Sequence, residues 1–460
     1  MNGLRVPELS DDETITLNIL LEQLRKKEPR NRLRSASYDG KQAVKQVGTV
    51  IPAQYRRLAM ALGWTAKGVD GLARRCNIDK FVWADGDLDS LGMQGLVDDN
   101  FLLSELAQGR TDSLIHGVSF LITTQGLDGE PDVLIHAKDG RNATGQYNAR
   151  RRALDSLLSI TERDGSEVTG FVLYLDNVTI NAQRVDGAWQ VDRSEHAWHV
   201  PAEPVVYRPR TSRRFGRSRI TRPALSHQMS ALRALVRLEA HMDIYAIPKL
   251  LVLGAGDDIF KNADGSPKDS WQVVMGRVFG IPDDDEAANP RADVKQFSAE
   301  SPAPHLSQLN ALAKLEAREF DLPDTDFALT DVANPTSADS YTASRENLIA
   351  EAEGFMGDID APVRRTVMRA LAMRNGLSEV PKEWSGIQPK WRSPIYLSKA
   401  QQADAGVKIL SAMPDLANTE VGMELAGLDT QQIQRAQAEI KRNAGRNVLA
   451  AIVDRNANGA

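Results

Sequence analysis

The spacing of apolar side chains along the chain predicts a protein that is mainly helical. In several long stretches, apolar residues recur every three to four positions, which is the period of one face of an α-helix. These stretches are 11–27, 52–75 (two pieces broken at Gly63 and Gly68), 98–115, 303–320, 338–375 and a C-terminal helical unit at 398–455.

The period changes between residues 118 and 207, where short runs are rich in β-branched and aromatic residues. Asp128-Gly129 and Asp186-Gly187 are turn signals between such runs, which is typical of antiparallel strands. The strands that this pattern predicts are 118–124, 132–136, 170–175, 178–184 and 189–192. A helix is expected among them, at 145–162, so the region is interpreted as mixed α/β.

The segment 223–246 is predicted to form a helix. Pro223 suits the first helical turn and Pro248 closes the segment. At 1.5 Å per residue, this helix would be roughly 35 Å long. It has two offset apolar stripes, which imply neighbours on two sides: Leu225, Met229, Leu232 and Val236 form one, and Leu235, Leu238, Met242 and Tyr245 form the other.

The order of elements after residue 223 predicts a stalk with a cap. Residues 249–300 interrupt the helical pattern with β-prone runs at 250–253 and 273–281. Helical spacing returns at 303–320, and a stretch rich in Pro, Asp and Asn follows at 321–336. Two helices separated by such an insert can run antiparallel, with the insert at their far end.

Length, cysteine usage and charge narrow the class of protein. A chain of 460 residues is expected to form two or three compact units. Its single cysteine, Cys76, cannot form an internal disulfide and is interpreted as a buried structural thiol from a reducing environment. No apolar run is long enough to span a bilayer. The net charge of −6 argues against a protein that coats DNA over its whole surface.

One segment is strongly basic against this mildly acidic background. Seven arginines fall between residues 208 and 222, and they could bind the phosphates of DNA or a partner's acidic surface. A salt-bridged face between two subunits is the alternative, and the sequence leaves both open. The arginines considered for phosphate or inter-subunit contact are Arg208, Arg210, Arg213, Arg214, Arg217 and Arg219.

No motif in the sequence indicates catalysis or a cofactor. His196 and His199 stand near each other, but no cysteine or further histidine lies close enough to complete a zinc site. The consecutive acids Asp283, Asp284, Asp285 and Glu286 are interpreted as a solvated loop rather than a magnesium site. No phosphate-binding loop is present, so no nucleotide site is expected. The chain is therefore interpreted as a protein that is not an enzyme and carries no cofactor or metal.

Several stretches, in their order and spacing, resemble the portal proteins of tailed bacteriophages, notably the SPP1-type family found in phages of actinobacteria. The resemblance covers roughly residues 30 to 375. The stretches that carry it are Tyr38-Asp39-Gly40, Gly63-Trp64, Val69-Asp70, Ala73-Arg74-Arg75, Leu114 to Phe120, Phe215 to Ile220, Ile247-Pro248 and Ser337 to Tyr341.

The resemblance implies an α+β, mainly helical fold with the wing, stem, clip and crown regions of a portal. Residues 395–460 match the family least. The implied regions are an N-terminal wing (1–222), a stem helix (223–248), the clip (249–300), a second stem helix (301–320), a tunnel loop (321–337), a long bent wing helix with its connection (338–394) and a crown (395–460).

The resemblance also implies a homo-oligomeric ring, expected to contain twelve subunits, at the portal vertex of a virion assembled in the host cytoplasm. Double-stranded DNA would pass through it during packaging and ejection. The implied partners are the major capsid protein, a head-completion or adaptor protein and the terminase motor, with no membrane. Tunnel-loop candidates for facing DNA are Asn334, Pro335, Thr336 and Ser337; clip candidates for contacting a partner are Asp283, Asp284, Asp285 and Glu286.

A basic channel lining would hold DNA by its phosphates, whereas a neutral or acidic lining lets it slide. We therefore expect the arginines of 208–222 to lie at subunit interfaces or on the outer wing rather than along the narrowest bore. Two alternative functions stay open at this point. One is a nuclease-like phage enzyme that processes DNA, and the other is a scaffold or adaptor protein without a channel.

Overall fold

The computed structural model describes residues 3–42, 60–245, 249–253, 261–262, 264–266, 278–281, 293–297, 301–327, 343–396 and 399–457. The chain divides after Pro394 into two compact units, Met1–Pro394 and Ile395–Ala460. The division falls where the sequence analysis begins its C-terminal region.

The first unit mixes helices with antiparallel sheets, as predicted. Its helices are α1 (Asp11–Tyr38), α2 (Trp64–Ala73), α3 (Met93–Asp99), α4 (Leu102–His116), α5 (Arg222–Tyr245), α7 (Ala303–Glu319) and α9 (Glu346–Arg374). Short 3-10 turns lie at Asp89–Leu91, Asp324–Asp326 and Lys382–Gly386. The second unit contains α10 (Lys399–Ala412), a 3-10 turn at Pro414–Leu416, α11 (Glu420–Leu425) and α12 (Thr430–Ala457).

Four sheets are formed by the described strands. β3 (Val133–Asp139), β2 (Val118–Gln125) and β9 (Ala202–Val206) form one sheet in that order. A five-stranded meander contains β4 (Ala143–Asn148), β5 (Ala153–Asp164), β6 (Glu167–Leu175), β7 (Val178–Val185) and β8 (Ala188–Glu195). β1 (Ile78–Trp83) pairs antiparallel with β13 (Ile387–Trp391). β10 (Lys249–Leu253) lies between β11 (Val278–Ile281) and β12 (Asp293–Phe297).

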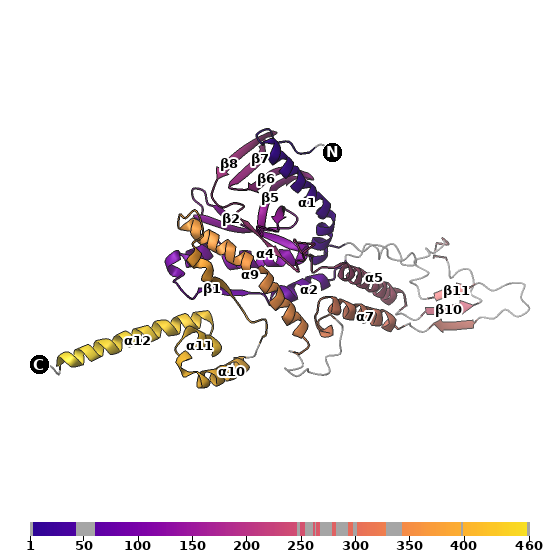
Figure 1. The fold of residues 1–460 in the computed structure, drawn as a ribbon. Helices are drawn as coiled ribbons and strands as arrows, with labels where there is room; N and C mark the ends of the chain where they lie inside the picture. The colour runs from indigo at the N-terminus through magenta and orange to yellow at the C-terminus, as the bar shows by residue number, and fades with distance from the viewer. Residues whose placement is uncertain are drawn as a thin grey trace, which may run out of the picture. The chain divides into compact units, whose positions relative to one another are not determined.

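Two sheets and three helices form successive layers of the first unit (Figure 1). α4 and α9 pack on one face of the three-stranded sheet. Its other face, which includes Phe120 and Ile122, packs against Leu157 and Tyr174 of the meander. α1 covers the far face of the meander. The largest core lies on the side of α4 and α9, and it includes residues of α5 and α7, the helices that follow the sheets in sequence.

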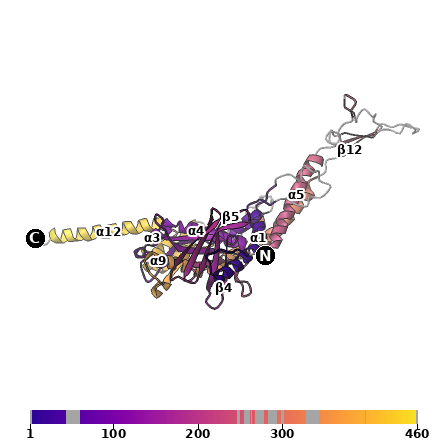
Figure 2. The same cartoon turned by 90° about the horizontal axis from the view of Figure 1, so that it is seen from above.

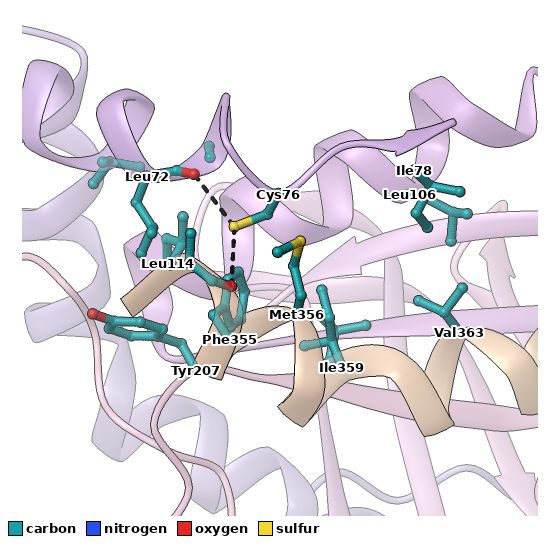
Figure 3. Packing of buried hydrophobic residues seen from close by; sticks show 14 of the residues in the cluster. Leu72, Cys76, Ile78, Leu106, Leu114, Tyr207, Phe355, Met356, Ile359 and Val363 are labelled. Atoms are coloured by element: carbon teal, nitrogen blue, oxygen red, sulfur yellow. Dashed lines mark hydrogen bonds between the residues drawn. The ribbon is translucent and has the colours of Figure 1, made fainter. Parts of the chain in front are cut away.

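Cys76 lies in that largest core, as the sequence analysis expects of a structural thiol. Its Sγ points toward the carbonyl oxygens of Leu72 and Ala352, at 3.4 and 3.8 Å, and Phe355 and Met356 of α9 pack around it (Figure 3). Burial raises the pKa of the thiol to about 12. The residue therefore stays a neutral, packed side chain at physiological pH.

The predicted helix at 145–162 is wrong, because these residues form β4 and β5. Leu154, Leu157 and Leu158 have the spacing of a helix face, but in β5 they are divided between two cores. Leu154 and Leu157 face the three-stranded sheet, whereas Leu158 faces α1. A strand buried on both faces loses the apolar–polar alternation that would reveal it in the sequence.

Other predicted elements are found with shifted ends. α1 continues beyond residue 27 through Pro29 to Tyr38, and the turn at Asp39-Gly40 follows it. The stretch 98–115 is divided between α3 and α4 at Phe101, which has a left-handed backbone (φ 46°). α2 runs unbroken through Gly68, contrary to the predicted break.

The predicted helices at 223–246, 303–320 and 338–375 are confirmed as α5, α7 and α9 over their described residues. Within the part of the chain that the structure describes, no helix has the length and apolar character needed to cross a membrane.

Candidate functional site: a helical hairpin and its basic surroundings

Helices α5 and α7 pack side by side and run in opposite directions (Figure 1). α5 extends away from the sheets (Figure 2). Three side-chain contacts join them along their length: Thr221, before α5, donates to Glu319; His227 Nδ1 lies 3.2 Å from Glu316 Oε2; and the rings of His241 and His305 lie 5.2 Å apart. Residue numbers rise along α5 as they fall along α7, so the pair is an antiparallel hairpin.

A carboxyl group is buried inside this hairpin. The side chain of Glu316 is fully buried, and its Oε1 has no hydrogen-bond partner among the described residues. Burial raises its pKa to about 9, and the nearby carboxylate of Glu319 adds to the shift. Glu316 is therefore protonated and neutral at pH 7.

A buried guanidinium closes the base of the hairpin. Arg219 stands three residues before α5, and its side chain is 3% exposed. Its Nε donates to the carbonyl oxygen of Gly68 at 2.9 Å, Nη1 donates to the hydroxyl of Tyr207 at 3.0 Å, and Nη2 donates to the carbonyl oxygen of Phe320 at 2.5 Å. Since Phe320 directly follows α7, one side chain connects both ends of the hairpin to α2.

A second polar network fastens the start of α5 to the N-terminal helices. The amide oxygen of Gln228 accepts the backbone N–H of Thr65 at 2.8 Å, and its Nε2 donates to Ser37 Oγ at 3.0 Å. All three residues are buried. Buried amides with several partners set a specific geometry, so the hairpin keeps one defined direction relative to α1 and α2.

Glu351 of α9 contacts three polar side chains at the base of the hairpin. It accepts hydrogen bonds from the hydroxyl of Tyr207 and from Arg208, and Arg219 Nη1 lies 3.9 Å from its Oε1. Burial by itself raises the pKa of Glu351, but the hydrogen bonds from Arg208 and Tyr207 outweigh it and hold the pKa below its usual value. Glu351 is thus a partly buried carboxylate matched by cations.

The six arginine candidates of the sequence analysis separate into two groups. Arg208 and Arg219 bind partners of their own chain, as described above. Arg219 is buried within a single subunit, so it has no surface to offer to a phosphate or a neighbouring chain. The other four side chains are exposed and make no ion pair with any residue that the structure describes: Arg210, Arg213, Arg214 and Arg217.

Two other sets of candidates lie outside the described residues. They are the tunnel-loop residues Asn334, Pro335, Thr336 and Ser337 and the clip residues Asp283, Asp284, Asp285 and Glu286. Among the described parts of the insert, β10 and β11 agree with the β-prone runs 250–253 and 273–281, whereas β12 lies outside the predicted runs.

The histidines near Trp198 take part in local hydrogen bonds. His199 Nδ1 lies 2.6 Å from Asp176 Oδ1, and His196 Nε2 lies 3.0 Å from Thr179 Oγ1. Over the ranges that the structure describes, no group of three or more His, Cys, Asp or Glu side chains is arranged to hold a metal ion.

The comparison with protein families decides the identity of this architecture. A sequence model of the family described as "Phage portal protein, SPP1 Gp6-like" matches residues 17–446, which is most of the chain. The chain belongs to this family. It is a portal protein, and its mainly helical α+β fold is the one that the sequence analysis expects.

Two phage relatives of this chain are portal proteins. The portal proteins of Mycobacterium phages D29 and L5 are each 24% identical over 387 and 385 residues, covering 82% and 81% of this chain and 78% and 77% of theirs. Solved structures with similar chains are titled "Neck of empty GTA particle computed with C6 symmetry" (14% identity, TM-score 0.41, 80% of this chain and 90% of that chain) and "Neck of native GTA particle computed with C12 symmetry" (15%, 0.41, 86% and 99%).

Proposed function

We propose that this portal protein assembles into a closed ring of twelve subunits around a channel for double-stranded DNA. A closed ring requires that each subunit offer two different surfaces to its neighbours. The observation that carries the proposal is the antiparallel hairpin of α5 and α7. α5 begins and α7 ends at one base, so identical hairpins placed side by side would form a wall around an open axis.

In this proposal, residues 223–248 and 301–320 are the stem and 249–300 the clip. Residues 1–222 and 338–394 form the wing, 321–337 the tunnel loop and 395–460 the crown. The rigid base formed by Arg219, Gln228 and Glu351 supports this reading, because a stem must hold its angle to the wing in every subunit. A variable angle would prevent the ring from closing.

The portal would conduct DNA without catalysing its movement. ATP hydrolysis would then come from a separate terminase motor, because the sequence contains no phosphate-binding loop. The ring would occupy one capsid vertex of the virion after assembly in the host cytoplasm. The major capsid protein would surround the wing, and a head-completion or adaptor protein would bind the clip.

The four tunnel-loop residues Asn334, Pro335, Thr336 and Ser337 would face the DNA. They are small and uncharged, so they could touch a duplex without trapping its phosphates. The acidic clip residues Asp283 to Glu286 would face partner proteins. The exposed arginines of 208–217 would lie away from the narrowest bore.

Native mass spectrometry and negative-stain imaging of the purified protein test the proposal together. We expect a particle with twelve times the subunit mass of 50.6 kDa and a central hole. A ring of eleven or thirteen subunits would agree with a channel but not with the stated number. A monomer or dimer at micromolar concentration, or DNA cleavage that depends on added metal, would contradict the proposal.

A further inference from the structure

Two basic segments that are far apart in sequence meet on one surface of the first unit. The Nζ atom of Lys27, in α1, lies 5.2 Å from the ring centre of Phe215, in the loop before α5. Phe215 in turn packs edge-on against Phe120 and Tyr147 of the two sheets. An aromatic anchor therefore holds the loop 208–217 against the basic half of α1.

Cations from both segments crowd around Arg213. Burial and then the charges of Arg30, Arg210 and Arg217 lower the pKa of Arg213. Burial and the charges of Arg30 and Arg213 likewise lower the pKa of Arg34 to about 10. These guanidiniums remain charged at neutral pH, so they repel one another across the contact between loop and helix.

A tight backbone turn fixes the position of the loop arginines. The N–H of Arg210 donates to the carbonyl oxygen of Arg213 at 3.2 Å, and the N–H of Arg213 donates back at 2.9 Å. Arg210, Arg213 and Arg217 are all exposed, as is Arg30 on α1. The cations are thus held on an ordered scaffold with their guanidinium groups accessible.

No acid neutralises this surface, which we call the basic junction and define by Lys27, Arg30, Arg34, Arg210, Arg213 and Arg217. In the part of the chain that the structure describes, none of these six forms an ion pair. The sequence contains no Asp or Glu at 29–38 or at 204–238. Arg208, by contrast, pairs with Glu351, so pairing is available to this segment where the fold uses it.

We propose that the basic junction binds the phosphate backbone of double-stranded DNA. Arginines clustered on one face are the electrostatic footprint of a nucleic-acid-binding protein. The one acid between Lys27 and Arg34 is Glu28, and it pairs with Arg141 instead. Exposed guanidiniums on a fixed scaffold suit the bidentate recognition of phosphates. This inference rests on the proposed function, which brings DNA to the ring, and it adds a phosphate-binding surface outside the narrowest bore.

Binding by the basic junction predicts a specific salt dependence. Each phosphate contact releases condensed counterions, so the logarithm of the binding constant falls with the logarithm of salt concentration by about 0.9 per contact. Neutralising one arginine on each arm should reduce that slope by about 2 for each engaged subunit. It should weaken binding without preference for any DNA sequence.

Fluorescence anisotropy with a labelled 40-base-pair duplex, from about 50 to 300 mM salt, measures this slope on the assembled protein. We expect the double variant Arg30→Gln/Arg213→Gln to lose at least tenfold in affinity at low salt and to show the smaller slope. The Arg30→Lys/Arg213→Lys variant keeps both charges and should retain most of the slope. Arg5→Gln/Arg150→Gln removes two exposed arginines elsewhere on the first unit and should leave the slope unchanged.

Native mass spectrometry of each sample separates this inference from the proposed function. If rings form but the Arg30→Gln/Arg213→Gln variant binds the duplex with the original slope, the basic junction does not hold DNA. The inference also fails if the native ring binds polyglutamate of equal charge but not the duplex, because that result would assign the surface to an acidic protein segment. Absence of rings in the native protein would instead contradict the proposed function.

Discussion

Nη2 of Arg219 donates to the carbonyl oxygen of Phe320 at 2.5 Å, across 101 residues of sequence. Arg219 lies just before α5, and Phe320 lies directly after α7. This hydrogen bond therefore joins the segment that enters the hairpin to the segment that leaves it. The guanidinium carbon Cζ of Arg219 also lies over the ring of Phe320, 5.6 Å from the ring centre. The hairpin is therefore closed at its base by one buried cation.

Arg219→Ala should be strongly destabilising. The change leaves the carbonyl oxygens of Gly68 and Phe320 without a donor and removes a cation from beside Glu351. Loss of one partner from a buried charged network costs about 3 to 5 kcal/mol of unfolding free energy. Urea denaturation measures it, with the exposed Arg214→Ala as the control, expected within about 0.5 kcal/mol of the native protein. Equal stability of the two variants would contradict this role for Arg219.

Gly68→Ala should destabilise the protein although alanine favours helices. A Cβ atom at position 68 would lie 2.4 Å from the ring of Phe320, so α2 and the hairpin base would have to separate. At so short a distance we expect a steric cost in the upper part of the range of about 1 to 3 kcal/mol, which exceeds the helix-propensity gain of about 1 kcal/mol.

Gly354→Ala in α9 is the matched control for this substitution. It meets open space and should stabilise the protein by about 0.5 to 1 kcal/mol. Thermal denaturation of both variants would show opposite shifts in Tm. A rise in Tm for Gly68→Ala would contradict the close packing of α2 against Phe320.

The buried carboxyl of Glu316 should make stability fall as pH rises. Its pKa is about 9 in the folded protein and about 4.5 in the unfolded chain, so the folded state binds the extra proton between these values. Below about pH 4.5 the group is protonated in both states and costs nothing. Between about pH 4.5 and 9 its contribution falls by about 1.4 kcal/mol for each pH unit.

Glu316→Gln replaces this carboxyl with a neutral group of the same shape. Chemical denaturation at pH 6, 7 and 8 should show that the variant gains stability relative to the native protein as pH rises. Glu346→Gln, an exposed change at the start of α9, is the control and should leave the pH profile unchanged. A parallel profile for Glu316→Gln would mean that Glu316 is ionised in the fold.

Cys76 should be unreactive in the native protein. Burial and a pKa of about 12 leave almost no thiolate at pH 8, and the thiolate is the reactive form. A colorimetric thiol assay should therefore detect no thiol before denaturation and one thiol per chain in urea. Rapid labelling of the folded protein would show that the core around α9 opens locally.

Much of the helical framework could be predicted from the sequence. α5, α7 and α9 have wide apolar stripes and clear ends, such as Pro223, so the period alone identifies them. The strand β5 could not be predicted in the same way. Leu157 and Leu158 are both buried, in different cores, because β5 lies between α1 and a second sheet. No local pattern encodes that second sheet.

The second half of α1 was also missed, for a related reason. Residues 28–38 have few apolar side chains, and tertiary contacts stabilise the helix there instead. Asn31 donates to the carbonyl oxygen of Gly140, Glu28 pairs with Arg141, and Ser37 contacts Thr65. These partners are far apart in sequence, so propensity and period carry no sign of them.

In the candidate site, too, the composition of a segment could be predicted from the sequence, whereas its tertiary contacts could not. The arginine cluster is visible as composition, and its exposed members could be proposed at once. The inward turn of Arg219 depends on Gly68 and Phe320, and the approach of Arg30 to Arg213 depends on how α1 crosses the loop. Both are tertiary relationships that a single sequence does not express.

The closed base of the hairpin makes its tip separable from the rest of the protein. The chain departs and returns at Arg219 and Phe320, and the hydrogen bonds of Arg219 and Gln228 fasten the hairpin at this base. Evolution could therefore exchange, lengthen or shorten the insert between α5 and α7 to suit a new partner while the layers beneath keep their packing. An experimenter could graft a foreign domain at the same place.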